Sequence, residues 1–251
     1  MKHHHNTWRT AAGVLFVVAA TGAQAQVISW NLDNNGTLGG ASQYAGVVSA
    51  NYWNNSWPSN PTTDLIDNSG AATTLDLAYA SWGTWSIQGS HPGQDANGSY
   101  NKELLNGYLN AGPAGWNPPI TDSHVTLTQI PYAQYNIYVY FSSDAANRPG
   151  YVTDGTTSYF FNTLGAASIA GSDALLIQTT ETSSANHPGA NYAVFSGLSG
   201  ASQTLTVQME QSDLWGGIAG FQVVAVPEPG VLSLGALGAI AFGVIRRSRR
   251  N

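Results

Sequence analysis

The chain has 251 residues, no cysteine and an uneven distribution of charge. Between Gln26 and Ala225 there are only two basic residues, Lys102 and Arg148, against thirteen acidic residues, which gives this stretch a net charge of −11. A surface this acidic repels nucleic acid and anionic lipid, so we expect neither as its partner. The lack of cysteine excludes disulfides, thiol catalysis and cysteine zinc sites, so the fold must depend on its hydrophobic core.

Residues 1–25 have the pattern of a secretory signal peptide. A basic start at Lys2 and Arg9 precedes an apolar run, and small residues stand at Ala23 and Ala25. This pattern predicts export and cleavage after Ala25. The three histidines near the start lie in the segment that would be removed, so we assign them no function.

From Gln26 onward, short apolar runs alternate with clusters of Gly, Asn, Ser, Thr and Pro, and helical periodicity is nearly absent. About ten to twelve strands in about 200 residues indicate an all-β fold, a two-sheet sandwich of the jelly-roll type. We expect one domain over residues 26–225. The expected strands are 27–32, 45–53, 74–79, 82–87, 124–130, 134–142, 151–153, 158–162, 175–179, 191–195, 203–209 and 217–226.

Four of these strands carry more specific expectations. The segment 74–79 alternates apolar and polar residues, which predicts one buried and one wet face. The segments 124–130 and 134–142 are predicted to pair with each other across Pro131. The last strand, 217–226, has apolar residues on both faces, which predicts a position deep inside a sheet.

The remaining local predictions concern turns and one helix. Asp154 and the glycine after it predict a hairpin between 151–153 and 158–162, because these residue types favour tight turns. The segment 54–61 is rich in asparagine and proline and is predicted to be an exposed loop. Four apolar residues within 101–109 suit one helical face, so this is the only helix that we expect in the domain.

Tryptophan supplies the candidate ligand-binding residues. Trp57 and Trp116 stand beside prolines in polar loops, and Trp82 and Trp85 are three residues apart in a predicted strand. An indole face can stack on the apolar face of a pyranose ring while neighbouring polar groups bind its hydroxyls. The alternative is structural, because the same tryptophans could cover the ends of a sandwich that has no disulfides.

Calcium is a possible cofactor, although nothing in the sequence requires one. Hard oxygen ligands occur in loops at Asp33, Asp95 and Asn97, and a divalent cation would stabilise so acidic a domain. None of these loops has the spacing of an EF-hand. Asx residues also cap backbone groups in turns, which is a local reason for their presence.

The sequence favours a non-catalytic protein. Glycoside hydrolysis needs two carboxylates across a cleft, and acidic residues are plentiful, but spacing does not identify such a pair. The serine-nucleophile pattern G-x-S-x-G is absent, and His91, His124 and His187 show no metal-binding spacing.

Residues 226–251 contain three successive features. Pro227, Glu228 and Pro229 come first, then an uncharged run over 230–245, then a basic cluster. At about 1.5 Å per residue the run would be roughly 24 Å long as a helix, close to the roughly 30 Å of a hydrocarbon core. The basic cluster, which is retained on the cytoplasmic side of a membrane, consists of Arg246, Arg247, Arg249 and Arg250.

These three features in this order resemble the PEP-CTERM sorting signal of Gram-negative bacteria. The resemblance implies that the chain is a substrate of an exosortase, a membrane-embedded protease or transpeptidase. It also implies cleavage near the motif and release to the cell surface or the extracellular polysaccharide. The two prolines would keep the cleavage region extended and accessible. The segment 82–162 is similar to domains common in such proteins and, more loosely, to galactose-binding-like modules.

Together these patterns predict an exported, C-terminally anchored protein of the cell surface or extracellular matrix, with exosortase, membrane and polysaccharide as partners. A non-catalytic structural role is the first interpretation. A lectin-like module, with or without calcium, is the alternative, and a polysaccharide hydrolase is the third.

Overall fold

The structure is a computed structural model that describes residues 25–32, 38–56, 62–89, 91–111, 122–211 and 215–227. The strands are β1 (Val27–Leu32), β2 (Asn54–Ser56), β3 (Asp76–Ala80), β4 (Gly83–Ser86), β5 (Gly107–Asn110), β6 (Asp122–Thr128), β7 (Gln134–Ser142), β8 (Ala146–Thr153), β9 (Ser158–Leu164), β10 (Tyr192–Ser199), β11 (Ser202–Met209) and β12 (Gly217–Ala225). The helices are α1 (Asn101–Asn106) and α2 (Ala167–Ala170).

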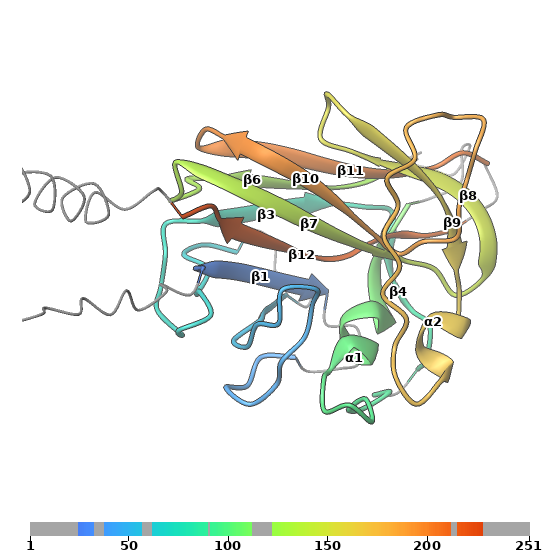
Figure 1. The fold of residues 1–251 in the computed structure, drawn as a ribbon, viewed down its shortest axis with the longest axis horizontal. Helices are drawn as coiled ribbons and strands as arrows, with labels where there is room; N and C mark the ends of the chain where they lie inside the picture. The colour runs from blue at the N-terminus through green and yellow to red at the C-terminus, as the bar shows by residue number, and fades with distance from the viewer. Residues whose placement is uncertain are drawn as a thin grey trace, which may run out of the picture.

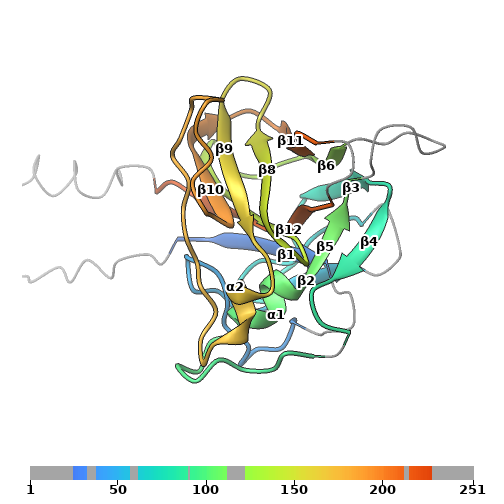
Figure 2. The same ribbon diagram turned by 90° about the vertical axis from the view of Figure 1, so that its right-hand side faces the viewer.

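Two five-stranded sheets face each other as a sandwich, and a two-stranded hairpin lies beside them (Figures 1 and 2). The first sheet has the order β10-β7-β12-β1-β2, and the second has the order β3-β6-β11-β8-β9. The hairpin consists of β4 and β5. The prediction of an all-β, two-sheet sandwich is therefore confirmed.

Several predicted strands are confirmed closely. The first strand and β7 have the predicted bounds, and β8 and β9 form the predicted hairpin, with Thr153 opposite Ser158. The turn between them is closed by Asp154, whose Oδ1 accepts hydrogen bonds from the N–H groups of Thr156 and Thr157. The last strand, β12, is buried along almost its whole length, as expected for a strand with apolar residues on both faces.

Other local predictions were wrong. Residues 45–53 form turns with a single bridge between Ala45 and Ala50, and the strand β2 lies instead in the segment predicted to be a loop. Residues 175–179 form no strand and make only an isolated bridge from Gln178 to β10. The described residues also contain a second short helix, α2. Isolated bridges and short strands of this kind depend on contacts with distant parts of the same chain, so local sequence periodicity does not predict them.

The predicted pairing of β6 with β7 was also wrong. β6 pairs with β11 and β3 in one sheet, whereas β7 pairs with β10 and β12 in the other. The short connection through Pro131 therefore crosses from one sheet to the other. Apolar alternation marks both strands as half-buried, but two strands that face each other across a core have the same pattern as two that pair.

The main core lies between the two sheets. From the first sheet it takes Trp30 of β1, which stacks on Phe221 of β12 with ring centroids 5.6 Å apart. Across the sandwich, Phe141 stacks on Phe161, with centroids 3.9 Å apart. Leu75 and Leu77 are buried here while their polar neighbours are not, which confirms the half-buried face of that segment.

A second apolar cluster covers the outer face of the first sheet. Tyr140 of β7 and Ala219 of β12 pack there against Leu104 and Leu105 of α1 and Ile169 of α2. The two helices lie side by side below the sheet in both views (Figures 1 and 2). This cover explains why β12 is buried on both faces.

The hairpin is positioned by the end of α1 and by a close contact with β12. The predicted helix 101–109 ends at Asn106, because Gly107 is extended (φ −95°, ψ 146°) and the chain continues as β5. At Gly217, β12 approaches β5 so closely that a Cβ atom on residue 217 would overlap the carbonyl oxygen of Leu109. Only glycine fits there, so the start of β12 fixes the position of the hairpin.

No helix within the described ranges is long and apolar enough to cross a membrane. The predicted membrane helix at 230–245 lies outside those ranges, as do all but the last residue of the predicted signal peptide.

Candidate functional site

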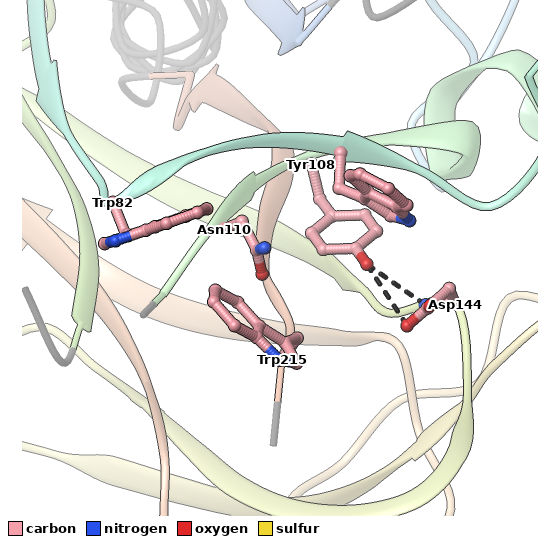
Figure 3. A pocket seen from close by; sticks show the side chains of 6 residues that line it. Trp82, Tyr108, Asn110, Asp144 and Trp215 are labelled. Atoms are coloured by element: carbon pink, nitrogen blue, oxygen red, sulfur yellow. Dashed lines mark hydrogen bonds between the residues drawn. The ribbon is translucent and has the colours of Figure 1, made fainter. Parts of the chain in front are cut away.

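A pocket of about 260 Å³ lies between the hairpin and the start of β12 (Figure 3). Three of the six residues that line it are tryptophans. The lining residues are Trp82, Trp85, Tyr108, Asn110, Asp144 and Trp215. They come from four segments of the chain: β4 with the residue before it, the strand β5, the turn after β7, and the residues just before β12.

The register of the hairpin places four residues on one face. Trp85 is paired with Tyr108, and Gly83 is paired with Asn110. Cross-strand partners share a face, and so do residues two apart, so all four point to the same side. A Cβ atom added at Gly83 would meet nothing within 4 Å, so the glycine leaves open space opposite Asn110.

The indoles of Trp82 and Trp215 meet edge to face, with ring centroids 4.9 Å apart and an interplanar angle of 64°. Both Trp82 and Trp85 are exposed for large apolar residues, at 39% and 54%. On folding, an exposed indole buries less apolar surface than an indole in the core does. A ligand that covers the exposed indoles would bury this remaining surface. Figure 3 shows Asn110 between Trp82 and Tyr108, with Trp215 beside it.

Arg148 holds the backbone that carries Trp215. Its Nη1 donates to the carbonyl oxygen of Trp215 at 2.7 Å, to Ser143 Oγ at 2.9 Å and to Asp144 Oδ1 at 2.7 Å. Ser143 Oγ also donates to the Trp215 carbonyl at 2.7 Å. One guanidinium therefore ties the turn after β7 to the residues before β12, and the arginine itself is 16% exposed.

Tyr108 and Asp144 are linked by two hydrogen bonds at the pocket. The Tyr108 hydroxyl donates to Asp144 Oδ1 at 3.4 Å and accepts from the Asp144 N–H at 3.2 Å. Burial, and then the negative charge of Asp144, raise the pKa of the Tyr108 hydroxyl far above its usual value. The tyrosine is thus held protonated, as a neutral donor beside a carboxylate.

The structure brings two of the four candidate tryptophans together. Trp82 and Trp85 line the same pocket, whereas Trp57 and Trp116 lie outside the described residues. Trp215 was not predicted as a site residue, because nothing near it in the sequence marks a site. Asn110 was not predicted either, although its alternation with Tyr108 in a strand would have indicated a shared face.

The candidate calcium ligands Asp95 and Asn97 are occupied by hydrogen bonds of their own turn and its neighbours. Asp95 Oδ1 accepts from the Ala174 N–H at 2.5 Å, and its Oδ2 accepts from Ser99 Oγ and the Lys102 N–H. Asn97 Oδ1 accepts from the Ser99 N–H. In the described part of the chain, no three acidic, histidine or cysteine side chains gather closely enough to hold a metal ion.

The third calcium candidate, Asp33, lies outside the described residues. Of the predicted sorting motif only Pro227 is described, and it is exposed at the end of the fold. Glu228 and Pro229 fall outside, as do the four arginines of the basic cluster.

No protein-family model matches the chain, and no curated protein matches it. Similar solved structures include the ANX2 ectodomain and the ANXUR2 extracellular domain, both from Arabidopsis thaliana. The first has a TM-score of 0.46 and 10% identity and covers 82% of this chain and 52% of that one. The second has a TM-score of 0.46 and 12% identity, with coverages of 82% and 50%. The chain thus spans about half the length of these structures, and a likeness at this level carries no information on function.

Proposed function

We propose that the protein is an exported, non-catalytic carbohydrate-binding module and that the tryptophan pocket is its binding site. The observation that carries the proposal is the composition of the pocket, where three indoles and a phenol surround one amide and one carboxylate. Sugars have the matching chemistry, because their C–H faces stack on aromatic rings and their hydroxyls need a few directed polar partners.

The strand order supports a jelly roll as the scaffold. In one sheet β1, β12, β7 and β10 are neighbours in that order, and in the other sheet β6, β11, β8 and β9 are. Eight strands in two Greek keys define that architecture, which also occurs in lectins. On this assignment β2 and β3 extend the two sheets at their edges. The architecture alone does not imply the function, which rests on the pocket.

A cationic ligand fits the pocket less well than a sugar. Aromatic cages do bind ammonium groups, and Asp144 could add a negative charge. However, Asp144 Oδ1 already accepts a hydrogen bond from Arg148 at 2.7 Å, so a second positive charge would meet that guanidinium. A neutral ligand avoids this repulsion.

Loss of one indole should therefore weaken binding to a glycan. We expect Trp85→Ala to lower the affinity of the full chain for its glycan about tenfold or more, because central aromatic contacts dominate such sites. The binding is measured by titration against neutral and acidic polysaccharides, with calcium and then with EDTA. The protein is kept in a detergent that carries no sugar.

Two further variants separate binding from folding. Gly83→Val should fill the space opposite Asn110 and abolish binding with little change in the unfolding midpoint, because its added atoms meet open space. Leu175→Ala removes an exposed apolar side chain that does not line the pocket and should leave the affinity unchanged. Absence of binding to every glycan, with and without calcium, would favour a structural component of the extracellular matrix instead.

We also propose that a PEP-CTERM-type signal at residues 226–251 delivers the chain to the cell surface or extracellular matrix. The sequence motif and the basic cluster support this proposal. In a Gram-negative host with an exosortase, the chain should lose its C-terminal segment, as measured by the mass of the exported protein. Replacing the four arginines with glutamine should prevent this cleavage, and an identical mass in a host without exosortase would contradict the proposal.

A further inference from the structure

Asn110 is a buried polar residue at the pocket with an unused polar atom. The residue is only 4% exposed, and its side-chain Oδ1 has no hydrogen-bond partner in the described structure. Its backbone is paired normally, since the carbonyl oxygen accepts from the Trp82 N–H at 3.0 Å. The unsatisfied group is therefore the side chain alone, on the face of β5 that lines the pocket.

An unpaired buried amide destabilises a fold, so its presence needs an explanation. A ligand that hydrogen-bonds to it would provide one. A sugar hydroxyl both donates and accepts, so it satisfies the carboxamide in either orientation of its terminal atoms. Because Oδ1 is covered in the absence of ligand, the hydroxyl reaches it only when a neighbouring side chain of the pocket moves.

The charges around the pocket select against acidic sugars. Asp144 lines the pocket and is 40% exposed, so its negative charge faces an incoming ligand. Arg148 pairs with Asp144, but its Nη1 is already bonded to three oxygen atoms. The only other basic residue of the acidic stretch is Lys102, which does not line the pocket. A uronate would therefore meet a carboxylate, and no basic residue among the lining residues could pair with it.

The pocket is also small. Its volume of about 260 Å³ lies below the roughly 300 to 1,000 Å³ typical of pockets that enclose drug-sized ligands. It suits a single sugar unit of a chain better than a long segment.

We infer, on the basis of the proposed glycan binding, that the pocket takes one uncharged sugar unit and excludes uronates. Asp144 sets the preference for an uncharged unit, and Asn110 hydrogen-bonds to a hydroxyl of that unit. Because three tryptophans line the pocket, binding changes the tryptophan fluorescence of the protein.

The test compares matched neutral and acidic probes with the full chain in a sugar-free detergent. The probes are cello-oligosaccharide and β-1,4-manno-oligosaccharide, each with its C6-carboxylate counterpart, cellouronate and oligomannuronate. We expect the neutral member of a binding pair to bind at least tenfold more tightly at low salt, with a shift in tryptophan fluorescence. Added salt should reduce this ratio, because it screens the repulsion from Asp144.

Two variants test the role of Asn110. Asn110→Ala and the better-filling Asn110→Leu should each weaken neutral binding at least tenfold and should leave the unfolding midpoint unchanged or raised, because no bond of Oδ1 is lost. Asn186→Ala, at an exposed asparagine that does not line the pocket, serves as the matched control.

Equal affinity for the neutral and acidic probes would overturn the inference while leaving glycan binding intact. Undiminished binding by both Asn110 variants would do the same. Loss of binding in the Trp85→Ala variant together with either result would show that the pocket binds sugars without this selectivity. Failure of every probe to bind would overturn the inference together with the proposed function.

Discussion

Replacement of Arg148 with methionine is expected to lower the free energy of unfolding by about 3 kcal/mol and to abolish glycan binding. The guanidinium, mostly buried, donates to Asp144, Ser143 and the carbonyl oxygen of Trp215. Removing one partner of a buried ion pair costs roughly 3 to 5 kcal/mol, and the half-exposed Asp144 places this pair at the low end. Urea unfolding followed by far-UV circular dichroism measures the loss.

The other basic residue of the acidic stretch provides the control. Lys102→Met also removes one positive charge, but within the described residues no hydrogen bond from its side chain joins two segments, so the change should stay within about 0.5 kcal/mol. Arg148→Lys should recover only part of the stability, because an ammonium group lacks the planar fork that reaches several acceptors. Equal stability of the Arg148 and Lys102 methionine variants would contradict the role assigned to the guanidinium.

Stability is expected to fall steeply above pH 10, by about 4 kcal/mol at pH 11. Burial raises the pKa of Tyr108, Tyr132 and Tyr140 far above the unfolded value. Stabilisation from such groups is complete below the unfolded pKa of about 10 and is lost as the pH rises towards the folded pKa, because only the unfolded chain releases the protons. By one pH unit above the unfolded pKa, each tyrosine has lost about 1.4 kcal/mol of stabilisation.

Single phenylalanine variants identify the groups responsible. The loss of unfolding free energy between pH 10 and 11 should be smaller by about 1 kcal/mol in Tyr108→Phe, and by the same amount in Tyr140→Phe. Tyr140 donates to Gln222 Oε1 at 2.6 Å, so its variant should also be less stable at neutral pH. A flat pH profile, or an unchanged slope in both variants, would argue against buried, protonated tyrosines.

The sequence predicted best the strands whose side chains alternate or are apolar throughout. The strands β1, β7 and β12 were predicted this way, because burial on one or both faces requires an alternating or a continuous run of apolar residues in the sequence. The hairpin turn at Asp154 was equally predictable, since its side chain caps the turn locally. Each of these features depends on residues close together in the chain.

The pairing of strands and the pocket could not be predicted in the same way. Helical spacing within 101–109 competes with the pairing of Tyr108 to Trp85, and tertiary contact decides in favour of a strand after Asn106. Trp215 reaches the pocket because β12 lies in close contact with the backbone of β5 at Gly217, two residues further along the chain. Neither effect has a local sequence signal, so the tryptophan composition indicated a binding surface but not its members.

The central position of β12 has a mechanical consequence. Trp215 stands just before the strand, and the chain leaves its other end at Val226, nine strand residues or about 30 Å away. If the pocket holds a glycan while the C-terminal end is tethered, tension runs along β12, which pairs with β1 on one side and β7 on the other. Such a load must shear two ladders of backbone hydrogen bonds together instead of unzipping one, so the domain should resist extraction by flow or traction.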